Sequence, residues 1–217
     1  MRLAARGRFV AFEGGEAAGK STQARRLADV LGAHLTREPG GTPVGERIRG
    51  LVLDPALGHL EPRTEALLMA AARAQHVAEV IQPALAAGRH VVTDRFLASS
   101  VAYQGHGRGL DPDEVMDLSL WATAGLQPDI VVLLDVPGHV ASRRLGAPGD
   151  RLEAAGADFH RAVLDGFRSM AAQDPAGWMV IDGCGDPDAV AARIRNAVFE
   201  HPRFGSAAVA DRGRDRR

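Results

Sequence analysis

The sequence predicts an α/β protein in which a parallel sheet is covered by helices on both faces. Short apolar runs rich in valine and isoleucine recur along the chain without polar alternation, which is typical of strands buried on both faces. Helix-like stretches separate these runs, as the crossovers of a parallel sheet require. With 217 residues, 46% of them apolar, the chain has the size and composition of one compact domain.

The strands follow from their own residues. The first run, RFVAFE, ends in a glycine-rich loop, and a helix-like stretch follows it at 20–31. Each later run is short and rich in valine or isoleucine, and no internal repeat relates them. Strands are therefore expected at 8–13, 33–36, 90–93, 130–134 and 178–181.

The helices have recognisable ends. Alanine and leucine dominate residues 62–87, which predicts one long helix that Pro83 bends near its end. Asp111 and Asp186 are each followed by proline, the arrangement of an N-cap residue before the first helical position. Two further helices are therefore expected to begin at these aspartates and to run to about residues 121 and 199.

Charge and composition exclude several classes of function. The chain has 26 basic and 27 acidic residues, so no overall field attracts nucleic acid or an anionic membrane. No stretch approaches the roughly 20 apolar residues that span a bilayer, and the N-terminus lacks the apolar core of a signal peptide. The single cysteine, Cys184, cannot form an internal disulfide. We therefore expect a cytoplasmic protein with neither nucleic-acid nor membrane partners.

The strongest chemical signal follows the first strand and opens the next helix. GGEAAGKS at residues 14–21 matches the phosphate-binding pattern G-x-x-x-x-G-K-S. In such a loop the backbone amides surround phosphate oxygens, the lysine reaches the β and γ phosphates, and the hydroxyl binds Mg²⁺. Lys20 is the only lysine in the chain, which supports a specific role. The expected site for a nucleoside triphosphate, which is ATP if the chain is a kinase, comprises Gly14, Gly15, Glu16, Ala17, Ala18, Gly19, Lys20, Ser21 and Thr22.

The loop alone leaves phosphoryl transfer, a GTPase switch and a motor ATPase open. The N-K-x-D element of a GTPase needs a second lysine, which the chain lacks. Motor ATPases usually place a glutamate directly after a strand-end aspartate, whereas Asp94 precedes Arg95 and Asp135 precedes Val136. Both aspartates end predicted strands, so residue types alone do not decide which of them serves the metal.

Further segments carry a family resemblance. They are FEGGEAAGKST, TREPGGT, EALLMAAARAQH, DRFLASSVAYQGHGRG, PDIVVLLDV and DRLE, in this order between about residues 8 and 182. Together they resemble bacterial thymidylate kinases, nucleoside monophosphate kinases that make dTDP and ADP from dTMP and ATP. The resemblance implies a three-layer P-loop kinase fold with a five-stranded parallel sheet, a short mobile lid at about 143–152, and a homodimer. The domain would span residues 1–204, and the polar segment 205–217 is expected to be a disordered tail.

The resemblance also implies roles for individual residues. Ser21 and Asp94 would hold the Mg²⁺ that accompanies ATP, and Arg95 and Arg49 would hold the dTMP phosphate. The residues implied in catalysis are Lys20, Asp94, Arg95, Arg144 and Arg151. Those implied in dTMP binding are Glu16, Glu38, Arg49, Met69, Arg73, Arg95, Ser100, Tyr103 and Gln104.

Within the acceptor pocket, Arg73 would bind the thymine carbonyl, with Ser100 and Gln104 beside it at the base edge. Tyr103 would crowd the 2′ position of the sugar, and Glu16 would lie near the 3′-hydroxyl. Ordinary structural roles are the alternatives. Arg73 could instead pair internally with Glu65 or Glu38, Tyr103 could pack its ring in the core, and Arg95 could be a solvated surface residue.

Two departures from the family pattern bear on rate and selectivity. Ala17 occupies a P-loop position where some relatives have arginine, so the lid is expected to supply that charge through Arg151 or Arg144. Met69 stands where the family usually has phenylalanine, which replaces a stacking ring with a softer thioether. The sequence thus favours thymidylate kinase activity; another P-loop nucleotide or nucleoside kinase, or a non-catalytic nucleotide-binding regulator, is the alternative.

Overall fold

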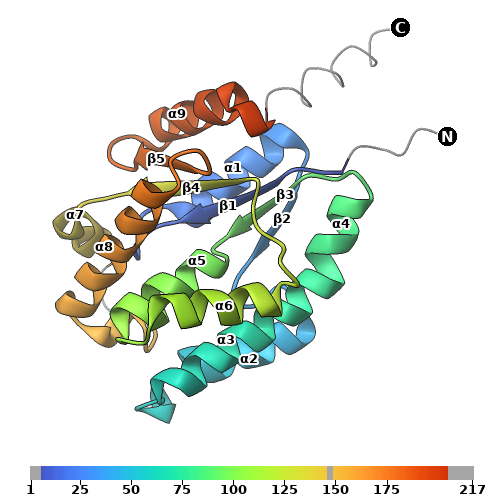
Figure 1. The fold of residues 1–217 in the computed structure, drawn as a ribbon. Coiled ribbons are helices and arrows are strands. Elements are labelled where there is room, and N and C mark those ends of the chain that lie inside the picture. The colour runs from blue at the N-terminus through green and yellow to red at the C-terminus, as the bar shows by residue number, and fades with distance from the viewer. Residues whose placement is uncertain (1–5, 146–148, 205–217) are drawn as a thin grey trace, which may run out of the picture.

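Five parallel strands form one sheet in the order β2-β3-β1-β4-β5 (Figure 1). The computed structural model describes residues 6–145 and 149–204, so the expected tail and the centre of the expected lid, 146–148, lie outside the described residues. Every predicted strand is present, with ends that differ by at most one residue from those predicted. The strands are β1 (Phe9–Glu13), β2 (His34–Arg37), β3 (Val91–Asp94), β4 (Ile130–Asp135) and β5 (Trp178–Asp182).

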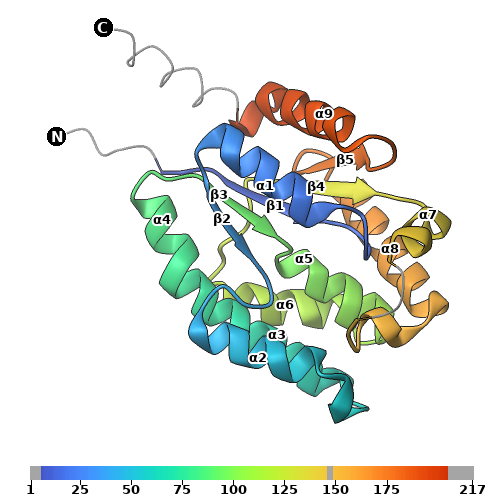
Figure 2. The same ribbon diagram turned by 180° about the vertical axis from the view of Figure 1, so that it is seen from behind.

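Helices cover both faces of the sheet, which confirms the three-layer prediction. Val10 and Phe12 of β1 pack in a core with α1 (Lys20–Leu31) and α9 (Pro187–Glu200). The alternate residues of β1, Phe9 and Ala11, pack in a second core on the other face. Figure 2 shows α1 on the near side of the sheet. The second core includes residues of α3 (Pro62–His76), α4 (Gln82–Ala86), α5 (Leu97–Ser100) and α8 (Ala157–Gln173).

The two aspartate N-caps are confirmed. The Asp111 carboxylate accepts a hydrogen bond from the Asp113 amide at 2.8 Å and caps α6 (Pro112–Ala122). The Asp186 carboxylate accepts from the Asp188 amide at 2.8 Å and caps α9. A proline follows each cap at the first helical position, where its missing amide hydrogen costs nothing.

The long helix at 62–87 is interrupted earlier than predicted. The chain is helical from 62 to 86, but α3 gives way to a π-helical segment, η2 (Val77–Ile81), before α4 begins. Pro83 lies within the first turn of α4 and not at a bend of its own. Because proline cannot donate the hydrogen bond of an α-helical turn, the irregular turn falls just before it.

Several helices were not predicted from the sequence. α2 (Pro43–Leu53) contains two glycines among its eleven residues, and each glycine lowers its helix propensity. Thr42 caps it by accepting from the Gly45 amide at 2.9 Å, and Val52 is fully buried. α5 continues into a second π-helical segment, η3 (Val101–Gly107). The remaining elements are α7 (Gly138–Leu145) and the 3₁₀ turns η1 (Pro55–Leu57) and η4 (Glu153–Ala155).

All five strands end at the same edge of the sheet, because all run parallel. The loops that follow β1, β2 and β3 therefore lie together, and open α/β sheets bind their ligands at this edge. Among the described residues no helix is both long enough and apolar enough to cross a membrane.

Candidate active site

A cavity of about 600 Å³ opens at the carboxyl edge of the sheet. Its volume falls within the range typical of small-molecule sites. The P-loop forms one wall, and residues from β2, α2, α3, β3 and η3 form the others. All nine residues expected to bind dTMP line it: Glu16, Glu38, Arg49, Met69, Arg73, Arg95, Ser100, Tyr103 and Gln104. The structure thus gathers residues that are up to 88 positions apart in the sequence.

The P-loop connects β1 to α1 and requires glycine at its start. Gly14 has a φ of +141°, and a Cβ there would lie 2.6 Å from the Leu134 carbonyl oxygen. Lys20 opens α1, and its ammonium donates to the Gly15 carbonyl oxygen at 2.6 Å. Burial, followed by the charge of Arg95, lowers the pKa of Lys20 to about 8. A buried ammonium with one carbonyl partner is poised to accept the negative charge of a phosphate.

Arg95 joins the P-loop to the end of β3. Its guanidinium donates to the Glu16 carboxylate at 2.7 Å and to the Tyr103 hydroxyl at 2.8 Å, and it lies over the Tyr103 ring. The same Glu16 oxygen accepts a hydrogen bond from the Tyr103 hydroxyl. Burial acts to raise the pKa of Glu16, but the charges of Arg95 and Lys20 lower it to about 2. Arg95 is therefore held inside the cavity and is not a solvated surface residue.

The backbone of Arg95 is strained, with a φ of +71°. Glu13, at the end of β1, fixes the turn that follows Arg95. Its fully buried carboxylate accepts from the backbone amides of Phe96 at 2.9 Å and Ser99 at 3.2 Å, and from the Ser99 hydroxyl at 2.6 Å. Burial raises the pKa of Glu13 to about 7. Sequence reasoning missed Glu13 and Ser99, although a glutamate ending an apolar strand is a recognisable signal.

Arg73 forms the internal pair with Glu38 that the sequence left open as an alternative. Its Nε atom donates to the Glu38 carboxylate at 2.8 Å, and both side chains are buried. His76 Nδ1 contacts the other Glu38 oxygen at 2.9 Å, and Thr36 contacts His76 Nε2 at 2.6 Å. Because a carboxylate only accepts, Nδ1 carries the hydrogen. His76 and Thr36 were not singled out from the sequence.

The remaining Arg73 nitrogens face the cavity wall. Nη2 donates to the Ser100 hydroxyl at 3.0 Å and to the Phe96 carbonyl oxygen at 3.2 Å, and Nη1 donates to the Ser119 hydroxyl at 3.2 Å. A guanidinium has five N–H donors, so four of the five are used. One Nη1 hydrogen has no hydrogen-bond partner among the described residues.

The two candidate aspartates have different surroundings. The Ser21 hydroxyl donates a short hydrogen bond to Asp94 Oδ2, whereas Asp135 pairs with Arg168 at 2.9 Å. Asp94 Oδ1 is buried and has no hydrogen-bond partner among the described residues. A hydroxyl and a carboxylate with a free oxygen are hard oxygen ligands, which suit Mg²⁺. Ser21 and Asp94 therefore fit the metal site that the family resemblance implies, and Asp135 does not.

Other arginines surround the cavity at different places. Arg49, on α2, donates to the Pro39 carbonyl oxygen at 3.0 Å, and burial, followed by the charge of Arg37, lowers its pKa. Arg37 also lines the cavity and was missed from the sequence. Of the two arginines expected in a lid, Arg144 lines the cavity and donates to the Gly183 carbonyl oxygen at 3.3 Å. Arg151 is bound elsewhere, to Glu65 and to the Val52 carbonyl oxygen.

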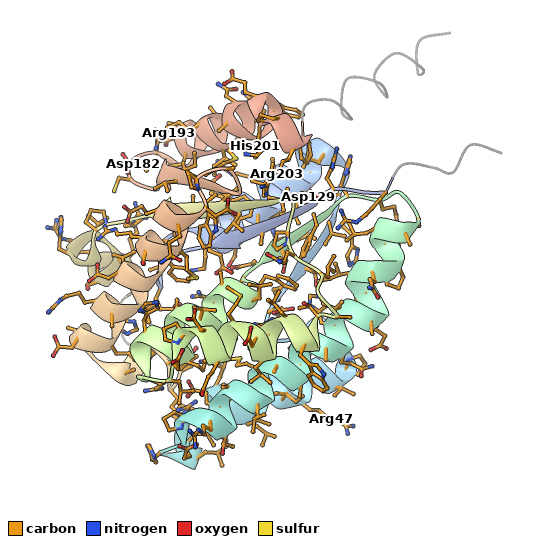
Figure 3. All side chains as sticks on the ribbon, in the orientation of Figure 1. Arg47, Asp129, Asp182, Arg193, His201 and Arg203 are labelled. Carbon is orange, nitrogen blue, oxygen red and sulfur yellow. The ribbon has the colours of Figure 1, made fainter. Side chains whose placement is uncertain are left out.

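The loop after β5 borders the same edge of the sheet. Arg193 on α9 donates to the carbonyl oxygens of Asp182 at 2.8 Å and Cys184 at 2.9 Å, and Figure 3 labels Asp182 and Arg193 in this region. This contact fixes the loop whose Gly183 carbonyl oxygen holds Arg144. The loop after β5 is thereby joined to α7 (Gly138–Leu145) through Arg144.

Comparison with known proteins identifies the family of the chain. A family model described as thymidylate kinase matches residues 12–194. A thymidylate kinase of Clavibacter sepedonicus is 49% identical over 197 residues, which cover 87% of this chain and 93% of that protein. One from Bifidobacterium longum strain DJO10A is 46% identical over 202 residues, covering 89% and 98%.

A solved structure gives the same result. The crystal structure of thymidylate kinase from Ehrlichia chaffeensis superposes with a TM-score of 0.70 at 29% identity, and the match covers 88% of this chain and 98% of that one. The chain therefore belongs to the thymidylate kinase family, whose members are ATP-dependent nucleoside monophosphate kinases.

Proposed function

We propose that this chain transfers the γ-phosphate of ATP to dTMP, giving dTDP and ADP. The observation that carries the proposal is one cavity that gathers the P-loop lysine and three arginines. Lys20 belongs to the P-loop, Arg37 and Arg49 come from β2 and α2, and Arg95 follows β3 and bonds to Glu16 of the P-loop at 2.7 Å. Phosphoryl transfer between two nucleotides needs two anion sites that face each other at a fixed distance. The family membership supplies the nucleotide pair.

On the donor side, Lys20 and the P-loop amides bind the β and γ phosphates. The charge of ATP would stabilise the Lys20 ammonium, which burial now destabilises. Ser21 and Asp94 would hold Mg²⁺, which would neutralise negative charge on the phosphates. Arg144 is the lid arginine best placed to reach the transferred group, because it lines the cavity. The lid is assigned to about residues 143–152 within a domain spanning 1–204.

On the acceptor side, Arg95 and Arg49 bind the dTMP phosphate. Arg73 offers its one free donor to the thymine carbonyl, with Ser100 and Gln104 nearby. Met69 contacts the base through its flexible thioether.

The sugar lies beside the pair formed by Glu16 and Tyr103. Tyr103 restricts the 2′ position, while Glu16 accepts from the 3′-hydroxyl through its second oxygen. Glu38 acts through Arg73, whose Nε atom it holds.

A coupled assay of ADP release across the common monophosphates tests the function. We expect rapid release with dTMP, and slow or no release with dAMP, dCMP and dGMP. Preference for another monophosphate would favour the alternative of a different P-loop kinase. ATP binding without any turnover would favour the alternative of a non-catalytic regulator.

The acceptor site has its own test on one helix. Arg49→Ala should raise the KM for dTMP strongly and leave the KM for ATP nearly unchanged, because the two anion sites are separate. Arg47 lies two residues away on α2 with its side chain exposed, so Arg47→Ala is the matched control and should change neither constant. An equal rise in both KM values for Arg49→Ala would contradict the separate sites.

We further propose a homodimer formed through α2, α3 and α6. These helices lie together (Figure 1), and each exposes a large apolar side chain. Leu51 is 50% exposed, Leu67 is 58% exposed and Trp121 is 81% exposed. Exposed apolar groups on neighbouring elements mark interaction surfaces. Sedimentation should give the mass of two chains, and Trp121→Glu should lower it to one; a single-chain mass before substitution would contradict the proposal.

A cytoplasmic location also belongs to this proposal. Its support is the pair of substrates, ATP and dTMP, together with the single cysteine of the chain.

A further inference from the structure

Glu65 is a fully buried carboxylate that the roles above do not use. It lies near the start of α3 and accepts hydrogen bonds from three side chains. Gln104 Nε2 donates at 2.9 Å, Arg108 donates through Nε and Nη2 at 3.3 Å, and Arg151 Nη2 forms a short contact. Removing one guanidinium partner of a buried carboxylate leaves the carboxylate charge less well compensated.

The three donors come from different parts of the fold. Gln104 belongs to η3, Arg108 directly follows η3, and Arg151 follows the centre of the proposed lid. Arg151 is also attached to the end of α2, since its Nε donates to the Val52 carbonyl oxygen at 2.9 Å. Its backbone amide donates to the Leu53 carbonyl oxygen at 3.2 Å. Glu65 thus joins α3, η3 and the base of the lid at one point.

The segments that Glu65 joins form one wall of the acceptor pocket. Gln104, Leu53, Asp150 and Leu152 all line the cavity, whereas Glu65 itself does not. Moving Arg151 would therefore shift the backbone that carries Asp150 and Leu152. Phosphoryl transfer is sensitive to small displacements of the groups that orient a substrate.

We propose that Glu65 is a positioning residue that holds the base of the lid, through Arg151, against the acceptor pocket. The inference rests on the proposed acceptor site and changes the role of one lid arginine. Arg151 is held through its Nε and Nη2 atoms, and so anchors the lid. Arg144 is then the guanidinium that meets the transferred phosphate.

Two variants test the anchor. Glu65→Gln removes the charge and keeps the shape, and Arg151→Met removes the guanidinium while leaving Gln104 and Arg108 on Glu65. The second variant keeps the test valid if the first does not fold. Glu79 is an exposed carboxylate on the same helical run, bonded to Gln75 at 2.8 Å, so Glu79→Gln is the matched control.

The kinetic readout is the division between KM and kcat. Loss of one charged hydrogen bond should raise the KM for dTMP on the order of tenfold in each variant. The KM for ATP and kcat should change less than about threefold, since a factor of three is well under 1 kcal/mol. The two substitutions should not add in the double variant, because both break one interaction. Glu79→Gln should behave like the unsubstituted chain.

A second readout needs no nucleotide. Hydrogen–deuterium exchange of the peptide covering 149–153 should quicken in both variants. Without the side-chain anchor, the Arg151 amide is held less firmly against the Leu53 carbonyl oxygen on α2. This readout separates the anchor from the acceptor assignment. Faster exchange would support the anchor whichever monophosphate is the substrate. If the KM that rises is the one for a monophosphate other than dTMP, only the proposed substrate is overturned.

Three results would overturn the proposal. A kcat loss of about 100-fold in Arg151→Met with an unchanged dTMP KM would assign Arg151 to the transferred phosphate, since about 2.7 kcal/mol is typical of a transition-state contact. Equal rises in both KM values would indicate general destabilisation. Unchanged exchange at 149–153 would show that Glu65 does not hold the lid base.

Discussion

The buried pair between Arg73 and Glu38 can be broken by Arg73→Met, which keeps an unbranched side chain of similar reach. Arg73 is 3% exposed and uses four of its five donors inside the protein. Its removal leaves the Glu38 carboxylate buried, with His76 as its one remaining side-chain partner among the described residues. Breaking a buried ion pair from one side costs about 3–5 kcal/mol. That loss is a large share of the roughly 5–15 kcal/mol by which a domain is stable.

Urea unfolding without nucleotide measures this loss as a change in the free energy of unfolding. Adding Glu38→Gln to Arg73→Met removes the unpaired charge, so the double variant should be more stable than Arg73→Met alone. Arg47→Met is the control, because Figure 3 shows Arg47 at the lower edge, pointing away from the helices. It should change the free energy by less than about 0.5 kcal/mol. A cost below about 1 kcal/mol for Arg73→Met would refute the buried pair as a structural element.

The same substitution bounds what Arg73 contributes to dTMP. A single remaining donor makes one hydrogen bond to a neutral carbonyl, worth about 0.5–1.5 kcal/mol. The KM for dTMP should therefore rise about two- to tenfold in Arg73→Met, measured at a temperature where the variant is folded. A rise of about 1000-fold would mean that Arg73 exchanges Glu38 for the ligand, because one hydrogen bond cannot supply about 4 kcal/mol.

Three further predictions concern other residues of the site. Lys20→Ala should lower kcat by at least ~10²-fold and leave the urea midpoint nearly unchanged. Lys20→Arg should also be inactive, because the planar guanidinium does not fit the loop. Near-normal turnover in either variant would exclude the P-loop assignment. Burial raises the pKa of Glu13 to about 7 in the folded protein. Between about pH 4.5 and 7 the folded protein therefore binds one proton more than the unfolded chain. The free energy of unfolding falls as the pH rises through this window. In urea titrations the free energy of unfolding should be about 3 kcal/mol lower at pH 8 than at pH 5, and Glu13→Gln should abolish this difference. The same difference in Glu13→Gln as in the unsubstituted chain would contradict a protonated, buried Glu13. Met69→Phe should tighten dTMP up to about tenfold in a competition assay, and effects that add independently with Arg73→Met would place Met69 outside the base pocket.

The sequence predicted the sheet and the P-loop because both are local signals. Buried strands of β1 and β4 are continuous apolar runs, and the loop at 14–21 is defined by spacing alone. The caps of α6 and α9 were likewise readable from an aspartate and a proline. α2 escaped prediction because its glycines weaken local propensity, and its helix is stabilised by packing against α3.

The partners of the side chains in the site could be predicted from the sequence only in part. The sequence left two acidic partners open for Arg73, Glu38 and Glu65. The three-dimensional structure shows that Arg73 pairs with Glu38. Glu65 takes Arg108 and Arg151 instead, from positions 43 and 86 residues away. Such choices depend on how helices are placed against the sheet, which no periodicity encodes. The contacts of Arg151, which the resemblance implies in catalysis, were equally hidden from the sequence: its side chain bonds to Glu65 and to the Val52 carbonyl oxygen.

The pairing of Arg95 with Glu16 joins the two halves of the proposed reaction site. Each residue follows a different strand, and the pair forms because β1 lies directly beside β3, with Phe12 opposite Asp94 in the register. The arginine proposed for the acceptor phosphate is thereby tied to the loop proposed for the donor. A transfer reaction gains most when the distance between its reactants is fixed before they bind. The order of strands in the sheet, more than any single residue, therefore sets the separation of the two phosphates.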